Sequence, residues 1–253
     1  MYKLLLTLLV IAGVYLFLNN RKSINPDTGQ TPPPSDNQII PVQPKKSITI
    51  KNGELSYALT YEKVSDRNLT IIPNFTEKRS ASTIAEENKC VIASSGGFYT
   101  KDNKPLGLLK IDGTVLNKRV TTTNLLTGFL SYGNDGVWTI GRVPDENFST
   151  IVQSGPFFEK GINFSSNNTE TARRIIVFED LERILYLGAL YNETNTRSGP
   201  ELSKIPELVF SLKQPFTVQK ILNLDGGSAS FFKYSNGFTL SELVPVGNIL
   251  CIK

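Results

Sequence analysis

From residue 47 onward the sequence consists largely of short apolar or alternating runs separated by turn signals, and this pattern restricts the fold most. Runs of about four to eight residues that are rich in β-branched and aromatic side chains predict β-strands. The clearest case is a hairpin in which residues 47–50 and 55–61 flank Asn52-Gly53. Further strands are expected at 69–72, 90–93, 107–111, 128–132, 137–140, 175–178, 184–190, 221–224, 231–234 and 248–252.

Helices are expected at only two places. Residues 82–88 are compatible with a short helix. Residues 198–212 are a better candidate, because Ser198 can cap the helix and Pro200 suits its first turn. A helix followed by the apolar strand 221–224 suggests an α/β crossover. The predicted fold class is therefore α+β, a single domain with a mixed, strand-rich sheet and few helices.

Composition excludes several kinds of chemistry. The 253 residues contain no histidine, so histidine triads, histidine bases and histidine metal ligands are ruled out. Acid–base catalysis would then rely mainly on carboxylates, as in sugar hydrolysis. The formal net charge is +4, but five basic and two acidic residues lie in residues 1–46. The remainder is close to neutral, so no nucleic-acid partner is expected.

The N-terminus predicts export. Lys3 precedes an apolar run over residues 4–18, which is shorter than the roughly 20 residues of a spanning helix. No small-x-small cleavage site follows, so an uncleaved membrane anchor is favoured over a cleaved signal sequence. Residues 1–22 are expected to be this anchor or signal, 23–46 a proline-rich linker, and 47–253 the globular domain. The domain would then be extracytoplasmic and membrane-anchored, or secreted if the segment is cleaved.

The only two cysteines, Cys90 and Cys251, are too far apart in sequence to be a CxxC redox or metal pair. In an exported domain they could form one disulfide that closes a long loop. Two buried free thiols are the alternative, and the sequence leaves both open.

Four segments at predicted strand ends are candidates for a functional site: SSGGFY at 94–99, QSGP at 153–156, ARRII at 172–176 and LNLDGGSAS at 222–230. The last is the strongest, because an apolar strand ends in Asp225 and then two glycines. Glycines allow close approach of a ligand to the backbone, and consecutive N–H groups can bind an anion. A tight strand-exit turn, with Asp225 capping its own backbone, is the structural alternative.

The order of these segments resembles the phosphodiester glycosidase family, whose pattern runs NGGFF, GxLxIxxG, Q[SA]GP, RTAIG, a helix, and LNLDGG[GS]S. The match covers about residues 91–251. It departs from the pattern at Ser95, where the family has Asn, at Arg174, where it has Thr, and at Val177, where it has Gly.

The resemblance implies hydrolysis of the glycosidic bond of a sugar-1-phosphodiester in a cell-surface or cell-wall glycan. The departing phosphate would need a cation and backbone donors, and the sugar carbon a carboxylate. Asp225 is expected in the carboxylate role and Arg173 on the phosphate. No cofactor is expected; Asp225 and backbone carbonyls could hold calcium, but no ligand spacing indicates it. The expected substrate-binding residues are Ser95, Gly96, Gly97, Gln153, Gly226, Gly227 and Ser228.

Two other functions remain compatible with the sequence. Ser95 and Val177 favour a non-catalytic surface protein that binds glycan or cell-wall polymer with a degenerate site. A structural interaction domain is the third reading, and it would show no ligand-dependent rise in melting temperature.

Overall fold

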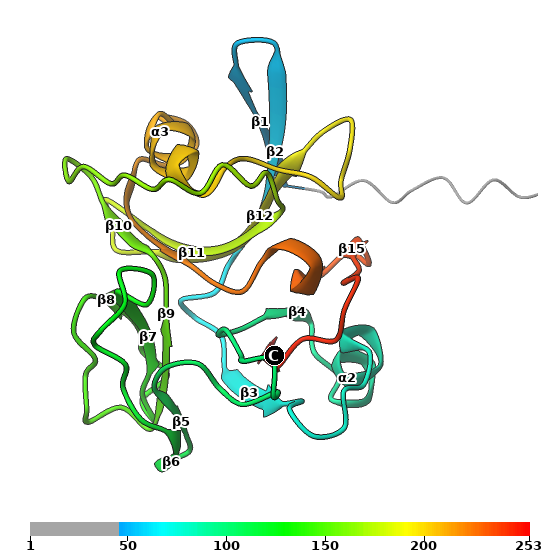
Figure 1. Cartoon of the computed structure of the whole chain (residues 1–253), viewed down its shortest axis with the longest axis vertical. Coiled ribbons are helices and arrows are strands. Elements are labelled where there is room, and N and C mark those ends of the chain that lie inside the picture. Colours follow the sequence, from blue (N-terminus) through cyan, green and yellow to red (C-terminus); the bar gives the residue numbers. More distant parts are fainter. Residues whose placement is uncertain (1–45) are drawn as a thin grey trace, which may run out of the picture. The chain divides into compact units, whose positions relative to one another are not determined.

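The computed structural model describes residues 46–253, which form three antiparallel β-sheets (Figure 1). The first has six strands in the order β1-β2-β12-β11-β13-β10, and the others have five each, in the orders β15-β14-β4-β16-β3 and β6-β5-β9-β7-β8. The strands of the first sheet are β1 (Ser47–Asn52), β2 (Leu55–Lys63), β10 (Phe157–Glu159), β11 (Arg174–Asp180), β12 (Leu185–Asn192) and β13 (Val218–Asn223). Those of the second are β3 (Leu69–Pro73), β4 (Ile92–Ser95), β14 (Phe232–Lys233), β15 (Thr239–Leu240) and β16 (Asn248–Ile252). Those of the third are β5 (Leu109–Ile111), β6 (Thr114–Asn117), β7 (Gly128–Tyr132), β8 (Trp138–Gly141) and β9 (Thr150–Ser154).

Strand β11 shows why the six-stranded sheet is central. Its side chains alternate between two buried faces, as a strand requires. Ile175 and Val177 pack into the core shared with the other two sheets, whereas Ile176 and Phe178 pack beneath helix α3 (Ile205–Phe210). A strand covered on both faces reads as a continuous apolar run, which explains the pattern at 175–178.

The helices are short. Helix α2 (Ala81–Glu87) is capped by Ser80, whose side chain accepts the N–H of Thr83, and it agrees with the helix expected at 82–88. The helix expected at 198–212 is shorter than predicted: a 3₁₀ turn at Leu202–Lys204 leads into α3, which ends at Phe210. Glu201 is still extended, so the helix begins after Pro200 rather than at Ser198.

The predicted mixed sheet is wrong in its pairing. Every strand pair in the described residues is antiparallel, and β13, which follows α3, runs antiparallel to both β10 and β11. The expected α/β crossover is therefore absent from this part of the chain. The result is one mostly-β body, for which the α+β class is a loose description. Strands β6, β9, β10 and β15 were not expected from the sequence.

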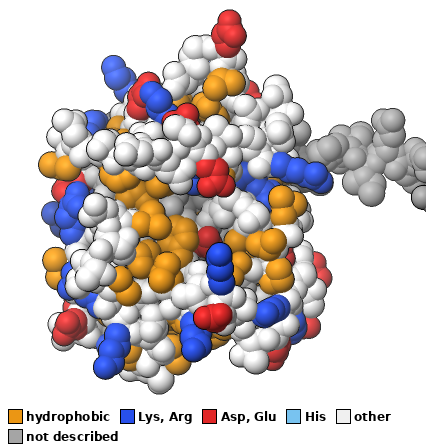
Figure 2. Space-filling model, in the orientation of Figure 1, with side chains coloured by type: hydrophobic (Ala, Val, Ile, Leu, Met, Phe, Trp, Pro, Cys, Tyr) orange, Lys and Arg blue, Asp and Glu red, His pale blue; other side chains and the backbone are white. Residues whose placement is uncertain are grey.

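Charged side chains of both signs are interspersed on the face of the molecule shown in Figure 2. Lys and Arg side chains do not gather there into one large patch. This distribution agrees with the nearly neutral composition of the globular body.

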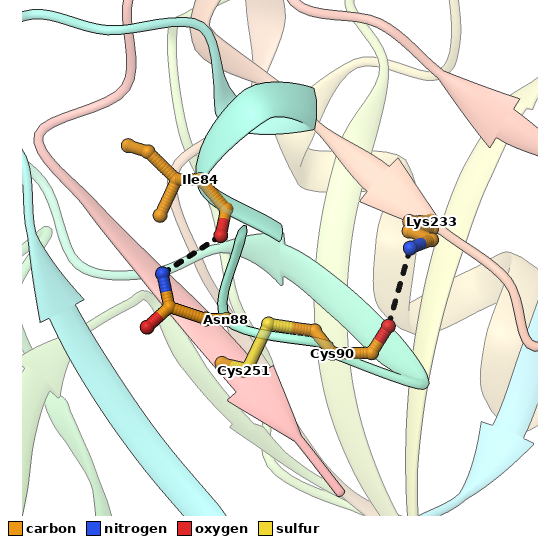
Figure 3. The surroundings of a disulfide bond; sticks show 5 residues. All are labelled: Ile84, Asn88, Cys90, Lys233 and Cys251. Carbon is orange, nitrogen blue, oxygen red and sulfur yellow. Dashed lines mark hydrogen bonds between the residues drawn. A yellow bond between two sulfur atoms is a disulfide. The ribbon is translucent and has the colours of Figure 1, made fainter. Parts of the chain in front are cut away.

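Cys90 and Cys251 form a disulfide, which decides between the two alternatives left open by the sequence. Their Cα atoms are 5.2 Å apart, although 161 positions separate them in sequence. The bond joins the segment before β4 to β16 and lies beneath α2 in a buried apolar cluster (Figure 3). Nearby, the ammonium of Lys233 donates to the Cys90 carbonyl at 3.2 Å.

The expectation of a transmembrane or signal-anchor helix is corrected. Residues 1–22 and most of the linker 23–46 lie outside the described residues, and the domain division at 47 stays a prediction. In residues 46–253, no helix has the length and apolarity needed to cross a membrane. The longest one, α2, has seven residues, about 10 Å of helix against the roughly 30 Å of a hydrocarbon core.

Candidate functional site

The candidate site is built around the segment that leaves β13, residues 223–228. Gly226 lies against the backbone of Arg173, and a Cβ there would be 2.8 Å from the Arg173 carbonyl oxygen. Gly227 has a φ of +63° and donates its N–H to the same carbonyl at 2.9 Å. The two glycines therefore let this turn pack directly on the strand that begins at Arg174, which bulkier residues would prevent.

The end of β4 holds the same turn from another direction. The Ser95 hydroxyl donates to the Asp225 carbonyl at 2.7 Å, and the Asp225 N–H donates to the Gly96 carbonyl at 2.8 Å. The hydroxyl of Ser95 is thereby used inside the protein rather than presented to a ligand.

The end of β9 supplies the third connection. The Ser154 hydroxyl donates to the Asn223 carbonyl at 2.8 Å, and the Asn223 side-chain amide donates to the Gly155 carbonyl at 2.9 Å. All four segments singled out in the sequence therefore meet at residues 223–227.

The glycine pair at 96–97 makes room for a protein side chain. A Cβ on Gly96 would collide with the Asn248 carboxamide. That carboxamide accepts the Gly97 N–H at 3.1 Å and donates to the Gly97 carbonyl at 3.0 Å. Asn248 was not expected in the site. Its only sequence signal is that it is a polar residue at the start of the apolar strand β16.

Asp225 lies at the centre of this arrangement with an exposed fraction of 8%. Burial raises the pKa of its carboxyl to about 7, and a hydrogen bond from the Gly226 N–H partly opposes this rise. Its Oδ2 atom has no hydrogen-bond partner in the described residues. Only four buried side-chain polar atoms in residues 46–253 lack a partner, and three belong to Arg173, Asn223 and Asp225. Such atoms in a native structure call for an explanation, and their concentration here marks the site.

Arg173 does not have the contacts expected of a phosphate-binding residue. It is 3% exposed, and its Nη2 donates to the carbonyls of Ser230 at 3.2 Å and Ser241 at 2.8 Å. In the described residues it forms no ion pair with Asp225. Burial lowers the pKa of its guanidinium. The side chain ties the 230–241 region to the β11 end, although its backbone does lie at the turn as expected.

Gln153 also has a different place from the one expected. It lies in strand β9, not in a turn, and its carboxamide oxygen accepts the N–H groups of Leu108 and Val120, both at 2.9 Å. Its amide nitrogen donates to the carbonyls of Val120 at 2.5 Å and Leu126 at 2.9 Å. With these four bonds made to backbone, the side chain holds the 118–126 loop and is not free to orient a sugar.

Replacing Gln153 by Leu should lower the free energy of unfolding by about 2–4 kcal/mol, because partly buried backbone groups lose their partner. Urea unfolding would measure the loss. Gln219→Leu is the matched control, since its side chain makes no hydrogen bond within the described residues, and it should change stability by less than about 0.5 kcal/mol. Equal effects of the two substitutions would contradict this role for Gln153.

A cavity of about 220 Å³ opens beside the turn. Gly226, Gly227 and Ser228 line it, together with Asn223, Phe98 and Arg174. Of the expected substrate-binding residues, Ser95, Gly96, Gly97 and Gln153 do not line this cavity, and neither does Asp225, which directly precedes the lining glycines. The arginine that reaches the cavity is Arg174, not Arg173.

Within residues 46–253, no group of three or more His, Cys, Asp or Glu side chains is placed to hold a metal ion.

No protein-family model matches the chain, and no curated protein matches it. Solved structures do resemble it. The zebrafish N-acetylglucosamine-1-phosphodiester alpha-N-acetylglucosaminidase catalytic domain, auto-inhibited by its pro-peptide, aligns over 82% of this chain and 81% of its own, with a TM-score of 0.57 and 15% identity. A hypothetical protein from Synechocystis aligns over 81% of this chain, with a TM-score of 0.61 and 14% identity; the alignment spans 61% of that protein's length. A Burkholderia pseudomallei protein described as exported aligns over 78% of this chain and 74% of its own, with a TM-score of 0.54 and 10% identity. At these identities the likeness is one of fold.

Proposed function

We propose that this protein hydrolyses the glycosidic bond of a sugar-1-phosphodiester, with a carbohydrate phosphodiester of a surface or cell-wall glycan as substrate. The fold resembles a catalytic domain named for such a reaction. The observation that carries the proposal is the buried Asp225 carboxyl, whose Oδ2 has no partner among residues 46–253 and which lies where four sequence segments meet.

The chemistry follows from the substrate. Water adds to the sugar C1 atom, the C1–O bond breaks, and a phosphomonoester leaves. Because the leaving group is already an anion of a fairly strong acid, acid assistance matters less than stabilisation of positive charge on the sugar. The ionised Asp225 carboxylate would supply that stabilisation, either directly or by taking a proton from the attacking water. Desolvation strengthens its field at short range.

The proposal predicts a particular pH dependence. Asp225 is protonated below its pKa of about 7 and ionised above it. If the ionised form is active, kcat/KM should rise with pH and level off above about 7. Release of N-acetylglucosamine from its methyl-phosphate diester would measure this. Activity that falls as pH rises through 7 would assign Asp225 to acid catalysis, and absence of release from this diester at every pH would contradict the proposed reaction for this substrate.

Glycan binding without hydrolysis is the second candidate. It is favoured by one observation: the polar groups of Ser95 and of Gly96-Gly97 bond within the protein and do not line the cavity. A non-catalytic binder would show a rise in melting temperature with a sugar phosphodiester but no release of sugar.

We further propose that residues 47–253 are an extracytoplasmic domain. The disulfide supports an oxidising compartment. A neighbour in fold is described as an exported protein.

A further inference from the structure

Arg173 and Arg174 are adjacent in sequence, but their side chains lie on opposite faces of the six-stranded sheet. Side chains alternate along a strand, so Arg173 lies on the face of Ile175, and Arg174 on that of Ile176. The contacts agree with this alternation. Arg173 reaches the carbonyls of Ser230 and Ser241, near the second sheet, whereas Arg174 reaches the region that precedes α3.

Arg174 is a buried charge that forms no ion pair within residues 46–253; burial lowers the pKa of its guanidinium, and the Glu170 carboxylate partly opposes this. Its exposed fraction is 8%. Its Nε donates to the Pro200 carbonyl at 3.1 Å and its Nη2 to the Glu170 carbonyl at 2.7 Å, and both acceptors are neutral backbone groups. It makes no ion pair within the described part of the chain, and its Nη1 has no acceptor there. Buried charges are normally paired directly, and in the described residues this guanidinium lacks a hydrogen-bonded anion.

Arg174 lines the cavity of about 220 Å³. Gly226, Gly227 and Ser228 also line it, and their exposed hydroxyl and side-chain-free backbone leave room for a polar group. Asn223 and Phe98 add a carboxamide and an aromatic ring to the lining. Glu170 also borders the cavity. Its exposed carboxylate attracts the Arg174 guanidinium from a distance, and its only hydrogen bond to Arg174 is through the backbone carbonyl. The volume is below that of pockets for drug-sized ligands and suits a phosphate or one sugar ring.

We propose that Arg174, and not Arg173, binds the phosphate group of the substrate in this cavity. The inference rests on the proposed function and names its anion-binding residue. A phosphate oxygen at Nη1 would give the guanidinium a third acceptor and a directly hydrogen-bonded anion, and guanidinium–phosphate pairs are among the stronger hydrogen bonds. Arg173, with its carbonyl partners on the other face, acts as a positioning residue for the 230–241 region.

The test compares the binding of inorganic phosphate, N-acetylglucosamine-1-phosphate and neutral N-acetylglucosamine by calorimetry at millimolar concentrations. The wild type should bind the two phosphates and discriminate against the neutral sugar. Arg174→Gln should weaken binding of both phosphates about 10- to 100-fold, as expected for loss of a charged hydrogen bond. Arg183→Gln removes the same charge from the exposed turn at the other end of β11 and should leave binding unchanged.

Unaltered phosphate binding by Arg174→Gln, or no phosphate binding by the wild type, would overturn the inference. If Arg174→Gln does not fold, backbone amide NMR of the wild type decides. Phosphate should then shift the signals of Gly226, Gly227 and Ser228, and shifts confined to other regions would refute the site.

The hydrolysis assay separates the two proposals. A wild type that binds phosphate through Arg174 but releases no sugar from the methyl-phosphate diester keeps the anion site and loses the proposed reaction. A wild type that hydrolyses the diester, together with an Arg174→Gln variant of unchanged KM, keeps the reaction and removes Arg174 from it.

Discussion

Asp225→Asn should abolish hydrolysis and, at the same time, make the protein more stable above pH 7. The loss of turnover follows from the proposed role, because an amide cannot carry the charge that stabilises the sugar cation or accept a proton from water. We expect kcat to fall by at least about 10³-fold, in the range typical of a lost catalytic group. Sugar release from the phosphodiester would measure it.

The gain in stability follows from the raised pKa of Asp225. Its ordinary value is 3.8, and burial raises it to about 7, so the folded state binds its proton more tightly than the unfolded state. Between these two values the folded protein loses stability as pH rises, and above pH 7 the full cost of burying the charge is present. A shift of about three pKa units corresponds to as much as about 4 kcal/mol. Asparagine cannot ionise, so the variant does not incur this cost.

Urea unfolding at pH 4 and pH 8 would test this. The variant and the wild type should be similar at pH 4, and the variant more stable at pH 8 by about 2–4 kcal/mol. Asp180→Asn is the control, because this buried carboxylate accepts hydrogen bonds from the N–H groups of Glu182 and Ile184, and its substitution should destabilise. If Asp225→Asn were no more stable than the wild type at pH 8, the carboxyl would not carry the cost of a buried charge.

Removal of the Cys90–Cys251 disulfide should have the largest effect on stability alone. The bond closes a loop spanning 161 positions, for which the chain-entropy model gives about 5 kcal/mol. For a domain of about 200 residues this corresponds to a fall in Tm of roughly 10–15 °C. The double variant Cys90→Ala, Cys251→Ala should show this fall in a calorimetric scan.

The wild type provides the control for that experiment. With a thiol reductant it should melt near the temperature of the double variant, and the reductant should not affect the double variant itself. A difference below about 1 kcal/mol would mean that pairing of β4 with β16 already holds the two segments together. The disulfide also bears on the site, since β4 ends at Ser95, which bonds the Asp225 carbonyl.

Several local features could be read from the sequence because they depend on neighbouring residues. Asn52-Gly53 predicted the hairpin of β1 and β2, where Asn52 pairs with Leu55 and Gly53 has a φ of +61°. The short helix expected at 82–88 is α2, whose N-cap is Ser80. The glycine pair after Asp225 predicted a backbone open to close approach by a ligand; in the structure the backbone of Arg173 makes a close approach to Gly226.

Other features depend on partners that are distant in sequence. Gln153 reads as a turn residue, but β9 pairs with β5 and β7, and the carboxamide is used by the 118–126 loop. Gly96-Gly97 reads as a ligand-binding backbone, but Asn248, 151 positions away from Gly97, occupies the space. Neither set of contacts can be predicted from neighbouring residues in the sequence, because each depends on which strands lie side by side.

Arg173 and Arg174 show most clearly which features local sequence determines and which depend on tertiary structure. The sequence by itself determined that the body is strand-rich, that its chemistry must do without histidine, and that an acid and paired glycines follow a buried strand. The tertiary structure alone decided that the strands pair antiparallel, that Cys90 meets Cys251, and that Arg174 reaches the cavity while Arg173 does not. Backbone preferences are set by each residue and its neighbours, whereas the face to which a strand side chain points acquires meaning only once the sheet is packed on both sides.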